Sequence, residues 1–289
     1  MIFLVKWKNL LKKNNPPTEH LLMSNYKFNP MKVVVLFAVF STILVFSACK
    51  KPVEPTPKAN LSITFRAVYE SNPMVVFSNY ATPNGDNIQF QTLNFMLSDL
   101  ILVKTNGEEV LLKDIEYIDF SNTYDVEKAT AGIVLTFNEI DTGTFKAIKF
   151  GVGVSPTLNA TEPDAYETTS PLSQTGNYWN AWNSYIFSRV EGILDTLPAA
   201  TGGNLSFFYH GGRDEMYQPR TFTKSFSLDE NQTNALSFKI ETKDIFYKTG
   251  AEMDIPAYSS SHANGAVGST DFNVSLQILT NIADALSVQ

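Results

Sequence analysis

Residues 61–69, LSITFRAVY, set the pattern from which the fold class of this chain follows. Apolar side chains at every second position, from Leu61 to Tyr69, alternate with the polar Ser62, Thr64 and Arg66. Successive side chains of a strand point to opposite faces, so a period of two predicts a half-buried β-strand. A strand that buries one face needs a second layer to cover it.

The same period recurs along most of the chain. We expect further strands over residues 74–78, 88–103 with a break at 97–99, 109–112, 132–137, 145–154, 185–193, 205–210, 221–228, 236–242 and 272–278. Turn signals such as Asn106-Gly107 and Gly211-Gly212 separate them. Only residues 279–286 predict a helix, which is short and lies at the C-terminal end. The expected fold is therefore all-β, a two-sheet antiparallel β-sandwich with a short C-terminal helix.

A lipoprotein signal peptide is expected over residues 31–48. Lys32 precedes an apolar run of 14 residues at 33–46, and Ser47-Ala48 precede Cys49. A charged start, an apolar run of roughly 7 to 15 residues and small residues before the break are typical of secretory signals. Small residues before a cysteine resemble a bacterial lipobox, so Cys49 is the predicted lipidation site. The alternative, a signal-anchor helix with an incidental cysteine, suits a longer run of roughly 20 residues.

The chain then divides into four parts. Residues 1–30 are expected to be an over-extended start, and residues 31–48 the signal. Residues 49–59 carry the lipidated cysteine and a linker with Pro52, Pro55 and Pro57, the composition of a semi-rigid tether. Residues 60–289 are expected to form the sandwich, although the 241 residues that follow position 48 would also suffice for two small domains.

Charge and cysteine content limit the partners. Residues 1–48 hold six of the 22 basic residues and one of the 29 acidic ones, so the mature chain has 16 basic and 28 acidic residues and a net charge of −12. Such a surface repels phosphate backbones and anionic headgroups, which argues against nucleic acid and assigns membrane attachment to lipid. With one cysteine in the chain, an internal disulfide is excluded.

Two histidines of the mature chain are candidate ligands. His210 ends the expected strand 205–210, on the same face as Ser206 and Phe208, and we expect Gly211-Gly212 to turn the backbone sharply after it. A lone histidine more often bonds to a backbone carbonyl than to a metal. His262 lies in the long polar loop 250–269 and by itself predicts a solvent-exposed residue. Imidazole pairs suit copper or zinc, but two ligands are too few for a closed site.

Two tryptophans follow a second long loop, residues 156–177. Trp179 and Trp182 belong to Tyr178-Trp179-Asn180-Ala181-Trp182, just before the expected strand 185–193. Core packing is the simpler interpretation for Trp182, whereas Trp179 is more open to a functional role. Motifs for hydrolases, zinc proteases, phosphate binding and dinucleotide binding do not occur in the sequence, so we do not expect an enzyme.

Several short stretches occur in a telling order along the chain. They are residues 95–100 (FMLSDL), 143–145 (GTF), 150–154 (FGVGV) with Asn159, the segment 179–192 that ends in Val190-Glu191-Gly192, Tyr209-His210-Gly211-Gly212, and a late histidine before Ile282-Ala283-Asp284. In this order they resemble the MbnP-like family of bacterial extracytoplasmic proteins, whose relatives include copper-binding surface proteins of methane-oxidising bacteria.

The resemblance implies a β-sandwich that, in some members, binds copper through histidines and a tryptophan oxidised to kynurenine by a di-haem partner enzyme. Carried over by position, His210 and His262 become candidate copper ligands, with Trp179 or Trp182 as the modified residue. With the predicted lipid anchor, we expect a protein attached to the bacterial outer membrane and facing the periplasm or the surface. Its expected partners are an outer-membrane transporter that receives copper, or a di-haem protein that modifies it.

Two functions therefore remain. The first is a non-catalytic lipoprotein that binds copper for uptake or storage. The second is a glycan- or protein-binding module in which Trp179, Trp182 and Tyr178 form an aromatic platform and no metal is bound. Geometry separates them, because imidazole nitrogens more than roughly 8 Å apart cannot share one ion when each metal-to-nitrogen bond is about 2 Å.

Overall fold

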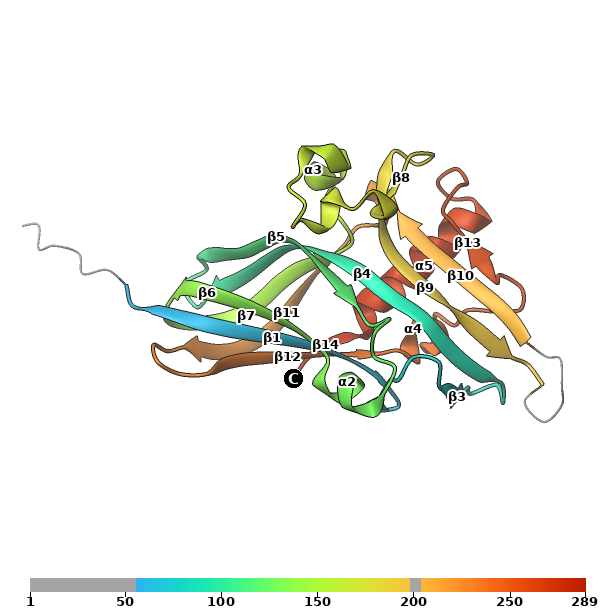
Figure 1. Ribbon diagram of the computed structural model, residues 1–289, viewed down its shortest axis with the longest axis horizontal. Coiled ribbons are helices and arrows are strands. Elements are labelled where there is room, and N and C mark those ends of the chain that lie inside the picture. The colour runs from blue at the N-terminus through green and yellow to red at the C-terminus, as the bar shows by residue number, and fades with distance from the viewer. Residues whose placement is uncertain (1–55, 198–203) are drawn as a thin grey trace, which may run out of the picture. The chain divides into compact units, whose positions relative to one another are not determined.

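One long central strand, β4 (Asn87–Lys104), organises the fold. The computed structural model describes residues 56–197 and 204–289. The N-terminal half of β4 pairs with β3 (Asn79–Ala81) and β9 (Ser184–Asp195), and its C-terminal half pairs with β5 (Glu109–Asp119) and β7 (Gly143–Val152). A single strand thereby links the two halves of the larger sheet (Figure 1).

The described residues form two sheets. The larger has nine strands, with β11-β7-β4-β9-β10-β13 in order and β3, β5 and β8 attached; the smaller has five, with β14-β12-β1-β2 in order and β6 paired with β1. The remaining strands are β1 (Lys58–Tyr69), β2 (Asn72–Pro73), β6 (Ile133–Asp141), β8 (Tyr178–Trp179), β10 (Asn204–Gly212), β11 (Gln218–Leu228), β12 (Asn234–Glu241), β13 (Ser260–Ser261) and β14 (Leu286–Val288). This confirms the predicted β-sandwich.

Most strand pairs are antiparallel, as expected, but β1 pairs in parallel with β12 and β10 in parallel with β13. Of the helices, α2 (Val126–Ala131), α3 (Pro156–Asn159) and α4 (Asp244–Tyr247) are short, and α5 (Thr270–Ala285) is the longest described. The 3₁₀ turns η1 (Pro163–Ala165), η2 (Pro171–Ser173), η3 (Thr175–Asn177) and η4 (Asp214–Met216) lie in connections.

Aromatic side chains fill the space between the sheets. Phe238 of β12 stacks on Phe65 of β1 at 5.1 Å between ring centroids and meets Phe150 of β7 edge-on at 5.3 Å. Phe222 of β11 joins them, 5.0 Å from Phe238. Each fully buried phenylalanine contributes roughly 1.5–3 kcal/mol of transfer free energy. This cluster joins the two sheets.

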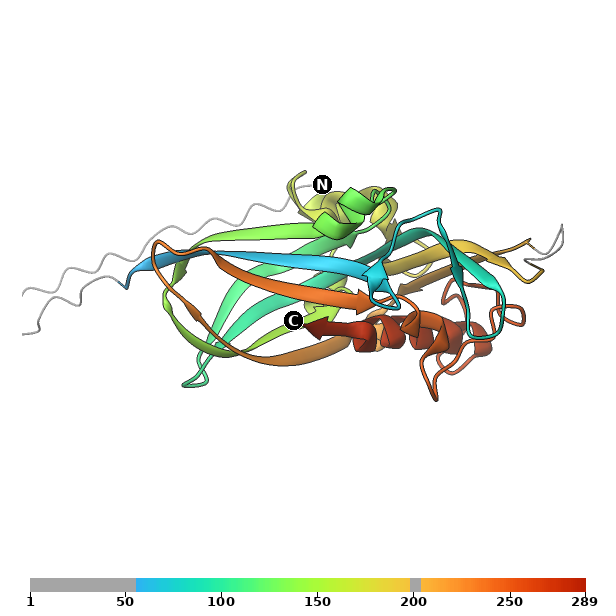
Figure 2. The same cartoon turned by 90° about the horizontal axis from the view of Figure 1, so that it is seen from below.

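A second aromatic cluster lies under the other half of the larger sheet. Phe246 of α4 meets Phe90 of β4 and Phe207 of β10 at 5.9 and 5.2 Å. Helix α5 packs beside it against β10 and α4, on the face of the sheet where Phe207 and Tyr209 are buried (Figures 1 and 2). His210, with the opposite orientation in β10, therefore faces away from α5.

Three sequence predictions are wrong in detail. Residues 272–278, expected to be a strand, belong to α5, because the Ser269 hydroxyl caps the Phe272 amide and buried side chains then recur every three to four residues. Residues 74–78 form no strand, although Met74 and Val76 are buried. Strand β4 does not break at 97–99 but carries a bulge there, with Asp99 at φ 56°.

The described residues begin at Thr56, within the expected linker 49–59. Cys49, the signal at 31–48 and the start at 1–30 lie outside the described residues. Strand β1 begins at Lys58, two residues before the expected start of the sandwich at residue 60. Residues Thr56–Gln289 make up one compact unit. In the described part of the chain, no helix combines the length and apolar character that a membrane span requires.

Candidate functional site: a histidine and tryptophan cluster

Four predicted site residues meet at one rim of the larger sheet. His210 lies near the C-terminal end of β10, His262 directly follows β13, Trp179 belongs to β8, and Trp182 lies in the turn between β8 and β9. Strand β8 pairs with the start of β9, and β10 pairs with β9 on one side and with β13 on the other (Figure 1). Residues 52 positions apart in sequence thus share one surface.

The two imidazoles are close and cross nearly at right angles. The ring centroids of His210 and His262 are 4.8 Å apart, with an interplanar angle of 83°. Trp179 lies beside both, at 6.2 Å from His210 and 5.6 Å from His262. Because each ring nitrogen lies close to its own centroid, the nearest nitrogens are well inside the roughly 8 Å limit for sharing one ion.

Strand pairing and helix α5 bring His262 to this position. Strand β13 pairs with β10 in parallel, with Ser261 opposite Tyr209. The residues that follow these two in the chain, His262 and His210, are therefore neighbours. The carboxylate of Asp271, in the first turn of α5, accepts hydrogen bonds from the backbone amides of His262 and Asn264 at 3.3 and 2.7 Å. His262 is half-buried, rather than the exposed loop residue that its local sequence predicts.

Trp182 supports Trp179 from the other side. The two indoles stack at 4.8 Å between ring centroids with an interplanar angle of 13°, and the Trp182 indole N–H donates to the Asn264 side chain at 2.7 Å. Trp182 is half-buried and packs against the hydrophobic core, as its core-packing interpretation predicts, although it lies in the turn before β9, which begins at Ser184.

The glycine pair after His210 has a different role from the one predicted. Gly211 and Gly212 lie within β10, and the chain turns only at Arg213, which has φ 81°. A Cβ added at Gly212 would lie 2.6 Å from the Trp182 ring and 2.7 Å from the Tyr185 carbonyl oxygen. The absence of a side chain at Gly212 therefore makes room for the indole that stacks on Trp179.

His210 is held in a polar but mostly enclosed position. Its side chain is 14% exposed, and its Nε2 lies 2.6 Å from Oε1 of Glu191. Burial lowers the pKa of His210 below its ordinary value; the Glu191 carboxylate opposes this shift, whereas the nearby His262 and Arg189 reinforce it. A lowered pKa favours the neutral imidazole, which is the form that binds metals.

The donor set fits a metal in part. Nδ1 of His210 is buried without a hydrogen-bond partner, and in the tautomer that carries the proton on Nε2 its lone pair is unshared. The described residues contain no cluster of three or more His, Cys, Asp or Glu side chains suited to a metal ion. An intact indole offers only an N–H donor. Two imidazoles are present, and a third ligand has to come from a modified Trp179, from water or from a ligand of the ion.

Sequence reasoning assigned no role to three residues that support this site. Glu191 holds His210, Asp271 holds the His262 loop, and Asn264 holds Trp182. Glu191 lies in the Val190-Glu191-Gly192 stretch of β9. Arg189 is the cross-strand neighbour of His210, and Glu191 is two residues from Arg189, so Glu191 and His210 lie on the same face of the sheet. The contacts of Asp271 with His262 and of Asn264 with Trp182 depend on the folded position of the loop that carries His262, so the sequence does not indicate them.

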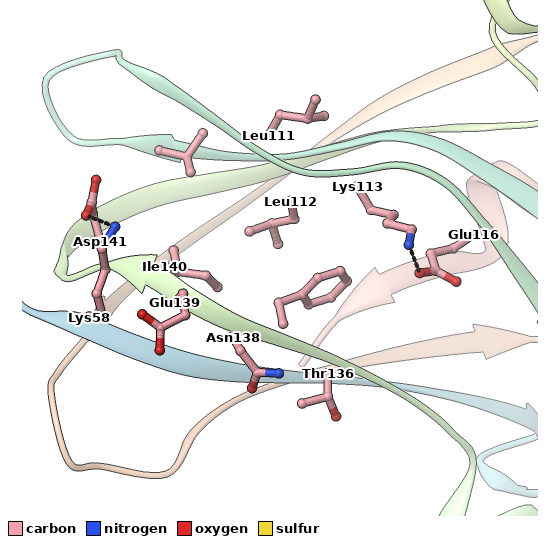
Figure 3. Close-up of a pocket in the computed structure, with 12 residues that line it drawn as sticks. Lys58, Leu111, Leu112, Lys113, Glu116, Thr136, Asn138, Glu139, Ile140 and Asp141 are labelled. Carbon is pink, nitrogen blue, oxygen red and sulfur yellow. Dashed lines mark ion pairs between the residues drawn. The ribbon is translucent and has the colours of Figure 1, made fainter. Parts of the chain in front are cut away.

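A separate groove of about 360 Å³ lies far from the cluster in the fold, between the edge strands β5 and β6 (Figure 3). Leu111, Leu112 and Ile140 line it, and the Lys58–Asp141 and Lys113–Glu116 ion pairs lie along it, at 2.7 and 3.9 Å. Its lining residues include no histidine or cysteine, so it offers no comparable set of nitrogen or sulfur ligands.

The fold and this rim define a class: a two-sheet β-sandwich that presents two histidines and a stacked tryptophan pair at one end. The chain belongs to the MbnP family, which its sequence matches over residues 58–264. A similar solved structure is MbnP from Methylosinus trichosporium, at 14% sequence identity and a TM-score of 0.47, covering 75% of this chain and 87% of that one. No curated protein matches the chain. Family membership is compatible with a copper-related role.

Proposed function

We propose that this protein is a non-catalytic, extracytoplasmic lipoprotein that binds copper for uptake or storage through His210 and His262. The observation that carries the proposal is the 4.8 Å separation of the two imidazole centroids, with Trp179 against both rings. Imidazole suits copper among the first-row metals. Nδ1 of His210 has no hydrogen-bond partner, and the pKa of the His210 imidazole is lowered; both observations support a role for His210 as a metal ligand.

Trp179, rather than Trp182, is the proposed site of oxidation. Trp179 contacts both imidazoles, whereas Trp182 stacks behind it and uses its indole N–H to bond Asn264. A di-haem partner enzyme supplied with an external oxidant (O₂ or peroxide) would cleave the C2–C3 bond of the Trp179 indole and add oxygen to both carbons. Hydrolysis would then release C2 as formate and leave an aromatic amine, which has the lone pair that the intact indole lacks. That amine would complete a three-ligand site with the two histidines.

The proposed setting is the bacterial outer membrane, with Cys49 as the lipid anchor and an outer-membrane transporter as the recipient of copper. The acidic mature chain supports a role apart from nucleic acid and anionic lipid surfaces. Several acyl chains hold a protein firmly where one chain holds it weakly, so the anchor requires no membrane-binding surface on the sandwich.

A competition titration against a chromogenic copper chelator tests the proposal. The protein is purified in its processed form, and Cu(I) and Cu(II) are each titrated into wild type, His210→Ala, His262→Ala and the double variant. We expect one copper per chain in wild type and none retained at this site in the double variant. Leu111→Ser, in the groove between β5 and β6, is the matched control. Equal copper uptake by wild type and the double variant would overturn the proposal.

Intact-mass measurement of the protein from its native membrane tests the modification separately. We expect the mass change of a tryptophan-to-kynurenine conversion, and peptide fragmentation should assign it to Trp179. An unmodified Trp179 in copper-loaded native protein would mean that water or another ligand completes the site. Modification at Trp182 would contradict the assignment made from the ring contacts.

One observation favours a second function, a glycan- or protein-binding module. The stacked Trp179 and Trp182 are only half-buried. In the same segment of the chain, Tyr178, Asn180 and Asn183 line a hollow of about 260 Å³ together with acidic side chains, although neither indole lines it. Aromatic faces with nearby amides and carboxylates are suited to sugars or peptides. Under this function, Trp179→Ala weakens ligand binding and chelators have no effect, the reverse of the copper result.

A further inference from the structure

Three side chains on three neighbouring strands form one hydrogen-bonded row that ends at His210. Thr92 of β4 lies opposite Glu191 of β9, and its hydroxyl donates to Oε2 of Glu191 at 3.0 Å. Oε1 of the same carboxylate lies 2.6 Å from Nε2 of His210, on β10. The row runs across the sheet, on the face away from α5, so the strand pairing itself sets its geometry.

The row determines which tautomer His210 adopts. A carboxylate only accepts hydrogen bonds, so the nitrogen that contacts Glu191 must carry the proton when the imidazole is neutral. Thr92 occupies the second carboxylate oxygen, which limits the rotation by which Glu191 could leave His210. Nδ1 is then the nitrogen with the lone pair, and it is the one that is buried without a partner.

We infer that Glu191 is a positioning residue for the metal site: it selects the Nε2–H tautomer of His210 and presents Nδ1 to the ion. This inference rests on the proposed function and adds to it the ligating atom and the residue that prepares it. Carboxylates in this relation to a ligand histidine orient its ring and raise its basicity, and their loss costs about 10- to 100-fold in metal affinity.

The arrangement differs from a purely structural tie between strands. A tie needs only the Glu191 contact, whereas burying Nδ1 without a hydrogen-bond partner carries an unfavourable contribution to stability. An ion bound at Nδ1 would satisfy that lone pair while the Glu191 contact stays in place. In this arrangement Glu191 contacts His210 and Thr92, so we assign it a role through His210 rather than a place in the ligand set.

The first experiment needs no metal. Nitrogen-15 NMR of the imidazole groups in the metal-free protein reports which ring nitrogen carries the proton. We expect a protonated Nε2 and an unprotonated Nδ1 for His210 in wild type, and a mixture of tautomers in Glu191→Ala. Glu191→Gln keeps an accepting oxygen, so it should largely restore the wild-type pattern and also guard against a folding defect in Glu191→Ala. An Nδ1–H tautomer in wild type would overturn the inference.

The second experiment measures copper affinity by chelator competition in the same proteins. We expect Glu191→Ala to bind about 10- to 100-fold more weakly and Glu191→Gln to fall between it and wild type. Glu109→Gln, which removes a carboxylate paired with Lys149 on the other half of the sheet, should match wild type. With Cu(I) bound, the nitrogen resonance that shifts most in His210 should be Nδ1.

The two proposals fail in different ways. A wild-type protein that takes up no copper overturns the proposed function and the metal role of Glu191 with it. A wild type that binds copper no more tightly than folded Glu191→Ala, or whose Nε2 rather than Nδ1 responds to Cu(I), overturns this inference alone.

Discussion

Trp179 lies between Trp182 and the two histidines, parallel to Trp182 at 13° and tilted by 57° to His262. The stack fixes the plane of the Trp179 ring, and the Asn264 hydrogen bond fixes Trp182. Asn264 belongs to the same loop as His262, so the loop that supplies one histidine also holds the aromatic pair. Because these four residues contact one another through the stack and the loop, we expect substitutions among them to have non-additive effects on stability.

Replacing Trp182 should loosen this unit. Trp182→Ala removes a half-buried ring, its stacking on Trp179 and the Asn264 hydrogen bond, and we expect it to lower the free energy of unfolding by about 2 kcal/mol. Trp182→Phe keeps an aromatic ring and loses the hydrogen bond, so about 1 kcal/mol is expected. Urea unfolding measures both. Equal losses in the two variants would mean that stacking contributes nothing.

A methyl group at Gly212 should displace the Trp182 indole. Gly212→Ala would bring a Cβ to 2.6 Å from that ring and 2.7 Å from a backbone oxygen, and we expect a loss of about 1–3 kcal/mol in the free energy of unfolding. Gly176→Ala is the matched control, because a Cβ there meets nothing within 4 Å. The tryptophan fluorescence maximum should move in Gly212→Ala only. Unchanged stability and fluorescence would contradict the close approach.

Copper should stabilise the folded protein through the two histidines. A ligand that binds only the native state adds about 2.7 kcal/mol when its free concentration is about 100 times Kd. We therefore expect the melting temperature to rise with buffered copper in wild type and to stay constant in the His210→Ala, His262→Ala double variant. Chelation should reverse the rise. A rise of equal size in the double variant would indicate that copper binds elsewhere.

An ion-pair group on α5 should make stability depend on acid pH. Burial alone would raise the pKa of Asp284, but hydrogen bonds from Lys248 and Arg220 and their charges hold it below its ordinary value. A depressed folded-state pKa stabilises the protein above the unfolded pKa of about 3.9, and this stabilisation is lost as the pH falls through the lower, folded value.

Asp284→Asn should therefore cost about 1 kcal/mol at pH 7, a cost that shrinks as the pH drops through that window. Glu116→Gln is the contrasting control, because burial raises the pKa of Glu116 and its charge adds no net stability at pH 7. Urea unfolding at a series of pH values compares the variants. A deficit in Asp284→Asn that persists unchanged in acid would exclude ionisation as its cause.

Local pattern was a good guide where the structure is locally determined. The alternation in residues 61–67 became the buried and half-buried faces of β1, and His210 shares a face with Phe208 as the period of two requires. The pattern misled at residues 272–278, where Phe272, Val274, Leu276 and Ile278 fit either period and the Ser269 cap favoured the helix. Parallel pairing of β1 with β12 has no local signal, because the partners are far apart in the chain.

The amino-acid sequence by itself determined the sandwich, the acidic character of the mature chain and the short set of side chains able to act, since periodicity, charge and residue type are local properties. The tertiary structure alone decided that His210 and His262 meet, that Trp179 faces both while Trp182 supports it, and that Glu191 holds His210. Those contacts depend on β13 joining β10 and on α5 anchoring the loop. Such long-range pairings form only when the whole core assembles, so they cannot be predicted from the spacing or composition of the residues involved.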